Sequence, residues 1–262
     1  VEAGQQSGIP LTKDFNGKSQ EGVSRYEHTI RGSKRCSAAR GYLHPALKRK
    51  NLHTQTDVTV ERIEFEAKKA IGVTFSRKGK SVTVKANREV ILSAGALNSP
   101  QIMLRSGVGP ADEIKPHGLE VVHELAGVGR NLQDHYGVVS QFACTQSVTL
   151  HRSAAWWRTQ LAGVQYLLLG KGDASFPPTA AGAFFKSSDE KAVCDMQIHY
   201  VSVAVPDVHG RSDIPTSHGF SSIVYGCRPE SRGHLGLKSA SLEDIPAIYP
   251  NYLAVEQDVI DI

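Results

Sequence analysis

The segment that constrains the fold most is REVILSAGALNSPQIMLRSGVGP, residues 88–110. Its apolar run at 90–92 is contiguous rather than alternating, which is typical of a strand buried on both faces of a parallel sheet. After a turn of small residues, the Asn-Ser-Pro triplet at 98–100 suits the start of a helix, and Gly107 suits its left-handed end. The segment therefore predicts a strand, a tight turn and a helix, as in folds that present backbone N–H groups to phosphate.

The G-x-G-x-x-G motif with which such folds open is absent from the sequence. Short strand-like stretches at 56–66, 71–78 and 81–95 are joined by turns, which predicts a β-meander whose last stretch leads into the apolar run. Downstream, residues 111–135 predict a short helix, a short strand and a Gly-rich loop. This part of the chain is therefore expected to be an α/β unit.

The C-terminal half predicts a different layer. A helix is expected over 153–170, followed by strand candidates at 194–205, 219–229 and 233–241, the last two joined by the hairpin signal PESRG. Near the N-terminus, SAARGYLHPALKRKN predicts a short or kinked helix because it contains a proline. The order of elements predicts two structural units, the second built on an antiparallel sheet.

Composition and charge exclude several function classes. A hydrophobic fraction of 40% and a charged fraction of 21% are ordinary for a globular chain of 262 residues. The formal charge of +4 is small and dispersed, so no nucleic-acid partner is expected, and the lysines at 68–69 and 78–80 are expected on a solvated face. The four cysteines form no C-x-x-C pair and no Cys/His pair has ligand spacing, which predicts free, buried thiols and no metal site.

No apolar run approaches the length of about 18 residues that a membrane span needs, so no transmembrane segment is expected. The opening stretch VEAGQQSGIPLTKDFNG lacks the basic start and apolar centre of a signal peptide, and the sequence does not begin with methionine. We therefore expect this chain to be a segment of a longer protein.

Several motifs together resemble one family. GALNSPQIMLRSGVG, residues 95–109, is similar position by position to the second signature of the glucose–methanol–choline (GMC) flavoprotein oxidoreductases. GVGRNLQDH at 127–135, SAARGYLHPAL, and GHLGLKSAS with PAIYPNYL follow in the family's order and spacing. The resemblance covers essentially the whole chain and is greatest to the bacterial choline- and alcohol-dehydrogenase branch.

The resemblance implies an α/β plus α+β fold. Residues 36–135 would be part of a Rossmann-like FAD-binding domain with a β-meander, 1–35 a connecting segment of the substrate domain, and 136–262 a substrate domain with an antiparallel sheet. It also implies FAD-dependent oxidation of an alcohol by hydride transfer to the flavin, with oxygen or a quinone as electron acceptor.

Two parts of the family pattern are absent from the sequence. One holds the G-x-G-x-x-G fingerprint and the glycine-rich loop beside the flavin, and the other holds the catalytic histidine pair near the family's C-terminus. We therefore expect an internal fragment that contains no catalytic residue, binds little FAD by itself and is inactive by itself.

Candidate cofactor contacts follow from the resemblance. Val60 matches a position whose backbone contacts the adenine, with a plain core valine as the alternative. Ala94, Gly95 and Ala96 form the strand-to-helix turn, where small side chains permit close approach of a cofactor or, alternatively, only close helix packing. Asn131 and His135, in GRNLQDH, are expected mainly to order a loop near the flavin.

Candidate substrate contacts lie in CDMQIHYVSV, because this sheet roofs the substrate cavity in the family. Gln197 and His199 are the polar residues that could touch substrate, with a solvent-facing position as the alternative.

Two other functions stay open. One is a cyanohydrin-type lyase on the same fold, and the other is a non-catalytic, truncated binding protein. The expected location is cytoplasmic or peripheral to a membrane. The alcohol, the acceptor, the oligomeric state and the choice between oxidase and dehydrogenase do not follow from the sequence.

Overall fold

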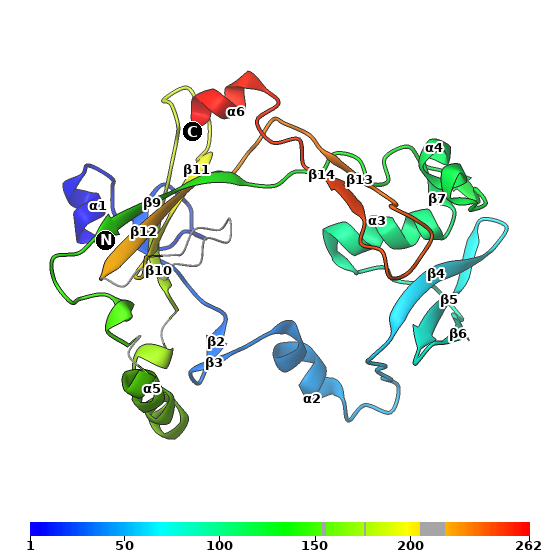
Figure 1. The fold of residues 1–262 in the computed structure, drawn as a ribbon, viewed down its shortest axis with the longest axis horizontal. Coiled ribbons are helices and arrows are strands. Elements are labelled where there is room, and N and C mark those ends of the chain that lie inside the picture. Colours follow the sequence, from blue (N-terminus) through cyan, green and yellow to red (C-terminus); the bar gives the residue numbers. More distant parts are fainter. Residues whose placement is uncertain (154–155, 176, 205–217) are drawn as a thin grey trace. The chain divides into compact units, whose positions relative to one another are not determined.

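The computed structural model describes residues 1–153, 156–175, 177–204 and 218–262 (Figure 1). These residues form two compact units. The five-stranded unit comprises residues 1–52, 135–228 and 257–262, and the meander unit comprises residues 53–134 and 229–256. The predicted helix over 153–170 and the predicted strand over 194–205 each extend in part outside the described residues.

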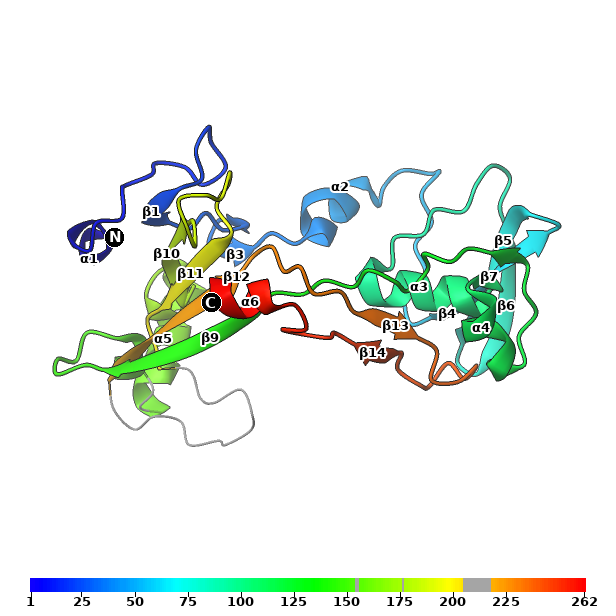
Figure 2. The same ribbon diagram turned by 90° about the horizontal axis from the view of Figure 1, so that it is seen from above.

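The five-stranded unit is built on one antiparallel sheet with the strand order β1-β10-β11-β12-β9. Its strands are β1 (Gly22–Arg25), β9 (Tyr136–Ala143), β10 (Thr179–Phe185), β11 (Met196–Val201) and β12 (Gly219–Gly226). β1 lies beside β10, with Gly22 paired to Phe184, although the two strands are far apart in the sequence (Figure 2).

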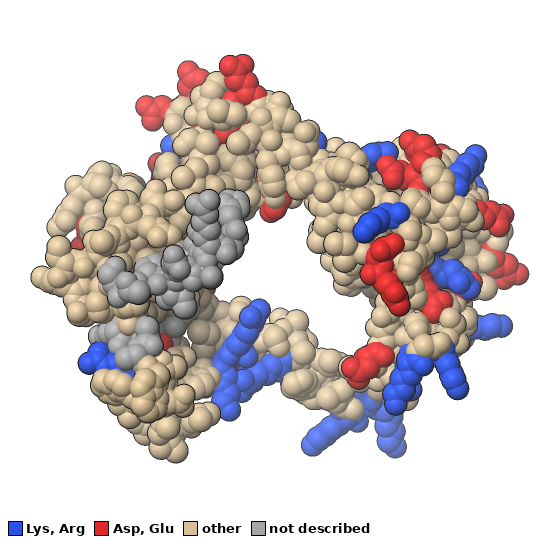
Figure 3. All heavy atoms as spheres, in the orientation of Figure 1, with Lys and Arg blue, Asp and Glu red and all other residues tan. Residues whose placement is uncertain are grey.

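The remaining elements of this unit are short, apart from one helix. They are α1 (Glu2–Gln6), the hairpin β2 (Ile30–Arg31) and β3 (Lys34–Arg35), the π-helix η1 (Ala39–Leu43), α2 (His44–Ala46), the 3₁₀ turns η3 (Leu150–Ser153) and η4 (Asp173–Ser175), α5 (Trp156–Leu169) and α6 (Glu256–Asp261). The surface over α5 shows almost no charge (Figure 3), and its large apolar side chains, Trp156 and Leu168 among them, are exposed.

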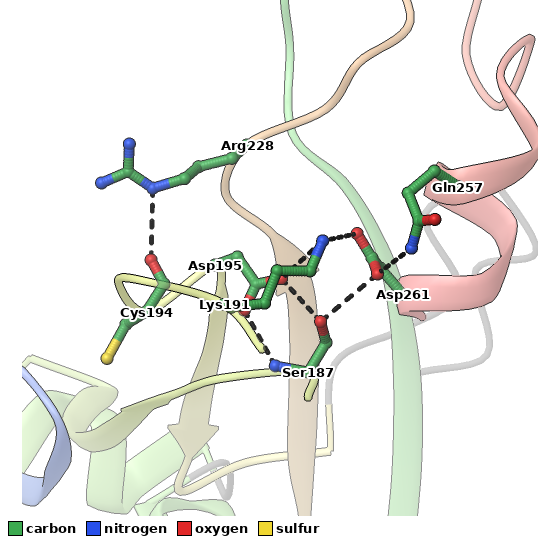
Figure 4. A network of polar contacts seen from close by, with 7 residues as sticks. All are labelled: Ser187, Lys191, Cys194, Asp195, Arg228, Gln257 and Asp261. Atoms are coloured by element: carbon green, nitrogen blue, oxygen red, sulfur yellow. Dashed lines mark hydrogen bonds and ion pairs between the residues drawn. The ribbon is translucent and has the colours of Figure 1, made fainter. Parts of the chain in front are cut away.

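A polar network fastens the C-terminal helix α6 to the connection between β10 and β11 (Figure 4). Lys191 Nζ lies 2.9 Å from Asp261 and 3.5 Å from Asp195. The Ser187 backbone N–H and hydroxyl donate to Asp195 at 2.8 and 2.6 Å, and Gln257 donates to Asp261 at 2.6 Å. Burial raises the pKa of Asp195, but the Ser187 hydrogen bonds and Lys191 outweigh it, so this pKa lies below its ordinary value.

The meander unit contains β4 (Thr59–Glu66), β5 (Lys69–Arg77) and β6 (Lys80–Lys85), each paired with its neighbour in sequence. It continues with α3 (Gly95–Arg105), β7 (Val108–Gly109), α4 (Ala111–Ile114), η2 (Lys115–His117), β8 (His123–Glu124), β13 (His234–Gly236) and β14 (Ala247–Tyr249). Its core is the buried cluster Leu104, Ile114, Val128 and Leu237.

Helix α3 is fastened to the meander by hydrogen bonds at its C-terminal end. The Arg105 guanidinium donates to the carbonyl oxygens of Val60 and Glu61, both at 3.2 Å. The buried Ser106 hydroxyl accepts the Ile63 N–H at 2.8 Å. These bonds fix β4 against the helix whose N-terminal turn carries the predicted cofactor contacts.

Three local predictions were wrong. Residues 90–92 form no strand, and Ile91 is 78% exposed. A strand that is buried on both faces needs a paired strand on each side, and none of the described strands pairs with residues 90–92. Helix α3 begins at Gly95, so Pro100 lies inside it and the Asn-Ser-Pro triplet does not start it. PESRG joins no hairpin, because β12 pairs in the five-stranded unit and β13 pairs with β14.

Other predictions were confirmed. The β-meander, α5, β11 and β12 occur where they were expected, and Gly107 has a φ of +79° just beyond α3. The fold class, α/β together with antiparallel sheets, is also confirmed. Strands β9 and β10 were missed. The domains predicted at 1–35, 36–135 and 136–262 assign cofactor and substrate roles, which the two compact units do not test, so those boundaries stay a prediction.

Candidate functional site

The turn at the start of α3 leaves open space around its glycine. Gly95 has a φ of +85°, and a Cβ added to it would meet no atom within 4 Å. The Ala94 N–H is held by the Ser99 hydroxyl at 3.0 Å. At Gly107, by contrast, an added Cβ would overlap the Glu120 carbonyl. Close packing therefore explains the glycine at 107, whereas at 95 the left-handed φ favours glycine and the space beside the backbone is open.

The predicted cofactor contacts of the meander unit line two cavities beside this turn. Val60 and Ala94 line a cavity of about 370 Å³ between β4, α3 and residues 242–246. Ala96 and Asn131 line a cavity of about 650 Å³ between α3 and the loop that precedes residue 134. The Val60 carbonyl accepts a hydrogen bond from Arg105. This small-residue turn between two hollows fits part of a dinucleotide cofactor.

The GVGRNLQDH loop is ordered by backbone contacts. Leu132 and Gly233 exchange N–H···O bonds at 3.0 and 2.9 Å, and the Leu235 N–H donates to the Gly129 carbonyl at 2.8 Å. The Tyr252 hydroxyl donates to the Asp134 carboxylate, and this bond raises the pKa of Tyr252. Asn131 takes a left-handed φ of +58°. These contacts order the loop, and the roles expected for Asn131 and His135 stay predictions.

In the five-stranded unit, strand alternation places Gln197 and His199 on one face of β11, where they touch. Gln197 Nε2 lies 2.9 Å from His199 Nε2 and 3.0 Å from the Tyr26 hydroxyl. The His199 ring meets the rings of Tyr26 and Tyr225 edge-on, at centroid distances of 5.0 Å each. Both predicted substrate residues thus belong to one half-buried polar and aromatic cluster rather than to an open surface.

Burial sets the protonation of this cluster. It lowers the pKa of His199, with His135 lowering it further, and it raises the pKa of Tyr26 to about 12. The His135 ring lies 6.4 Å from that of Tyr225. At neutral pH the cluster therefore offers a neutral imidazole and a neutral phenol, which suit hydrogen bonding to a hydroxyl group.

Sequence reasoning missed three members of the cluster. Tyr225 is paired with Gln197 across β12 and β11, and the Cys227 thiol lies 3.9 Å from Gln197 Oε1. Tyr26 comes from the end of β1, more than half the chain away. Alternation within β12 could have indicated Tyr225, but no local signal indicates that Tyr26 reaches β11.

No group of three or more His, Cys, Asp or Glu among the described residues is arranged to hold a metal ion. The four cysteines are free; Cys194 is buried and the other three are only partly buried, so the expectation of buried thiols was correct for one of them. None of the helices in the described ranges is long and apolar enough to cross a membrane.

Comparison with known proteins relates the chain to oxidoreductases. It is 42% identical over 262 residues to the mitochondrial choline dehydrogenase of Homo sapiens, covering all of this chain and 44% of that protein. It is 41% identical to the oxygen-dependent choline dehydrogenase of Pseudomonas syringae pv. syringae, covering 98% of this chain and 46% of that protein. The chain thus spans less than half the length of these relatives.

Solved structures share the fold. Pyridoxine 4-oxidase from Mesorbium loti superposes with a TM-score of 0.82 at 24% identity, over 99% of this chain and 47% of that one. Formate oxidase from Aspergillus oryzae gives a TM-score of 0.85 at 20% identity, over 99% and 49%.

A sequence profile of the GMC oxidoreductases matches residues 1–137, slightly more than half of the chain. This match includes the meander, the turn at the start of α3 and the GVGRNLQDH loop. The chain belongs to the GMC oxidoreductase family.

Proposed function

We propose that the protein containing this chain oxidises an alcohol with FAD as the hydride acceptor. The observation that carries the proposal is the open, small-residue turn at Gly95 in a chain of this family. When bound, FAD would accept the hydride removed from the alcohol carbon. Val60, Ala94, Gly95 and Ala96 would hold part of the cofactor, with Asn131 and His135 as further candidates. The electron acceptor would be oxygen or a quinone.

Gln197 and His199 are the proposed contacts of the alcohol. The neutral imidazole and the amide can orient a hydroxyl group by hydrogen bonding without placing a charge beside it. Choline is the first substrate to test, because the relatives named above are choline dehydrogenases. We also propose a cytoplasmic location, with any quinone acceptor reached at a membrane surface.

The test uses the intact protein purified with its cofactor. Anaerobic addition of choline or a simple primary alcohol should bleach the oxidised flavin spectrum, and a quinone analogue or oxygen should restore it. Absence of flavin from the intact protein, or a flavin that no alcohol in a broad panel reduces, would refute the proposal.

A matched pair of glycine variants tests the cofactor contact. Gly95→Ala and Gly118→Ala impose the same kind of left-handed strain, since φ is +85° and +71°, and an added Cβ meets no atom within 4 Å at either position. We expect Gly95→Ala to lower FAD affinity roughly ten-fold, through about 1.4 kcal/mol of lost contact, while Gly118→Ala keeps it. Equal FAD affinity in the two variants would exclude this turn from the cofactor site.

A further inference from the structure

Tyr26 lies outside every predicted site, yet it is built into the His199 cluster. It follows β1, and its backbone N–H donates to the Ala180 carbonyl at 3.0 Å. Its hydroxyl occupies space above Gly182 that a Cβ at that position would fill. Its ring also contacts Phe15, at a centroid distance of 5.3 Å. The missing side chain at Gly182 therefore admits the Tyr26 hydroxyl to the β11 backbone.

Counting protons fixes the orientation of the Gln197 amide. The Tyr26 hydroxyl has one proton, and the Ile198 carbonyl, 3.0 Å away, can only accept it. Toward Gln197 the hydroxyl oxygen must therefore accept, which requires the amide NH₂ group on that side, at 3.0 Å. The amide oxygen then faces the Cys227 thiol, which can donate to it.

The same count fixes the tautomer of His199. The Gln197 nitrogen has no lone pair to accept with, so it must donate to His199 Nε2, at 2.9 Å. Nε2 is therefore unprotonated, and the ring proton is on Nδ1. Burial and His135, which both lower the pKa of His199, agree with a neutral ring. Within the described part of the chain, no hydrogen bond occupies Nδ1.

We propose that Tyr26 is a positioning residue which, through Gln197, holds His199 as the neutral Nδ1–H tautomer. His199 then offers one hydrogen-bond donor, Nδ1–H, while its acceptor nitrogen is occupied by Gln197. In the alcohol oxidation proposed above, on which this consequence rests, His199 can donate to the substrate oxygen but cannot take the hydroxyl proton. The tautomer itself does not depend on that proposed function.

The direct test is ¹⁵N-detected NMR of the histidine side chains in the intact protein at neutral pH, with the His199 signal assigned by its loss in His199→Gln. A protonated and an unprotonated ring nitrogen have well-separated shifts, so the tautomer is read directly. The wild type should show protonated Nδ1 and unprotonated Nε2. A protonated Nε2, alone or in an imidazolium, would overturn the proposal.

Three variants test the part played by Tyr26. Tyr26→Phe keeps the ring but removes the acceptor that orients Gln197, so His199 should become a mixture of tautomers. Tyr225→Phe is the matched control: it removes a hydroxyl from another ring that contacts His199, and it should leave pure Nδ1–H. Gln197→Glu replaces the donor by an acceptor, and should move the proton to Nε2 and raise the pKa of His199.

An unchanged His199 signal in Tyr26→Phe would show that Tyr26 does not determine the tautomer of His199. If Tyr26→Phe does not fold, Gln197→Glu tests the proposal instead. An unprotonated Nε2 in that variant would contradict the assignment of Gln197 as the hydrogen-bond donor to His199.

Kinetics of the intact enzyme supply the functional measurement. Tyr26→Phe should lower kcat/KM about 3- to 10-fold, the effect of one misplaced hydrogen bond, with KM changed less than kcat. If Tyr26→Phe gave a mixture of His199 tautomers but an unaltered kcat/KM, Tyr26 would position His199 without any effect on catalysis, which would overturn the functional consequence. If no alcohol is oxidised at all while the NMR result holds, the proposed function fails and the tautomer assignment stands.

Discussion

The meander unit and the five-stranded unit reach their folds through different kinds of contact. In the meander unit, β4, β5 and β6 pair in sequence order through short turns. In the five-stranded unit, β1 and β9 are the two edges, and β1, from the start of the chain, pairs with β10, which follows it by more than 150 residues. Contacts near in sequence can be inferred from local patterns, whereas pairings such as Gly22 with Phe184 cannot. Local sequence patterns therefore determine the strand pairing of the meander unit but not that of the five-stranded sheet.

The largest expected effect is in the meander core. Leu104 is fully buried against Ile114, Val128 and Leu237, so Leu104→Ala should cost about 3–5 kcal/mol of unfolding free energy. Because this core belongs to one compact unit, hydrogen exchange should accelerate in β4–β6 and α3 before it does so in β9–β12.

Val84→Ala is the control for that experiment. Val84 is 54% exposed, and its truncation should change stability by no more than about 0.5 kcal/mol. Equal acceleration of exchange in both units of Leu104→Ala would show that they unfold as one, contrary to the comparison.

The candidate site shows the same contrast between contacts that are local in sequence and contacts that are distant. Gln197 and His199 were proposed because the resembled family places this strand over its substrate cavity, and the turn at 94–96 was proposed because it lies in a contiguous family motif. Their roles stay predictions. Tyr26 could not be found, since its contact with Gln197 depends on a register set across β1, β10 and β11. The expected strand at 90–92 failed for the converse reason: its apolar run is local, but strand formation depends on partners elsewhere.

The second-largest expected change in stability is in the five-stranded unit. Asp195 is buried and accepts two hydrogen bonds from Ser187, so Asp195→Asn should cost about 1–3 kcal/mol by weakening them and the Lys191 contact. Hydrogen exchange should rise in α6 and in the β10–β11 connection, which the network joins (Figure 4).

Asp189→Asn supplies the control for this network. Asp189 is exposed on the same connection, and the same change of charge there should leave stability nearly unaltered. If both variants were equally destabilised, loss of charge rather than loss of the network would explain the effect.

A smaller effect is expected from pH. The pKa of His199 is lowered by burial and by His135 from its ordinary value of 6.5. Below pH 6.5, His199 is therefore protonated in the unfolded chain while it stays neutral in the folded unit. Stability should therefore decline as the pH falls from about 6.5 toward the folded pKa, and be fully present above that window. Urea unfolding of wild type and His199→Gln across this range measures it; the variant should show a shallower decline. An equal slope in the two proteins would mean that other groups account for it.

The smallest expected change in stability tests the unpaired segment of the meander unit. Ile91 is 78% exposed in an apolar run that pairs with none of the described strands. Ile91→Lys should therefore change the unfolding free energy by no more than about 0.5 kcal/mol, and yet reduce association of the 1–262 chain, because an exposed apolar segment with free backbone groups is a template for strand pairing. Asn87→Lys adds the same charge at an exposed polar position nearby and controls for repulsion between chains. Light scattering during concentration should separate the two variants, with only Ile91→Lys suppressing aggregation. If both suppress it equally, net charge governs association, and the unpaired run at 90–92 is not the feature that makes this unit associate.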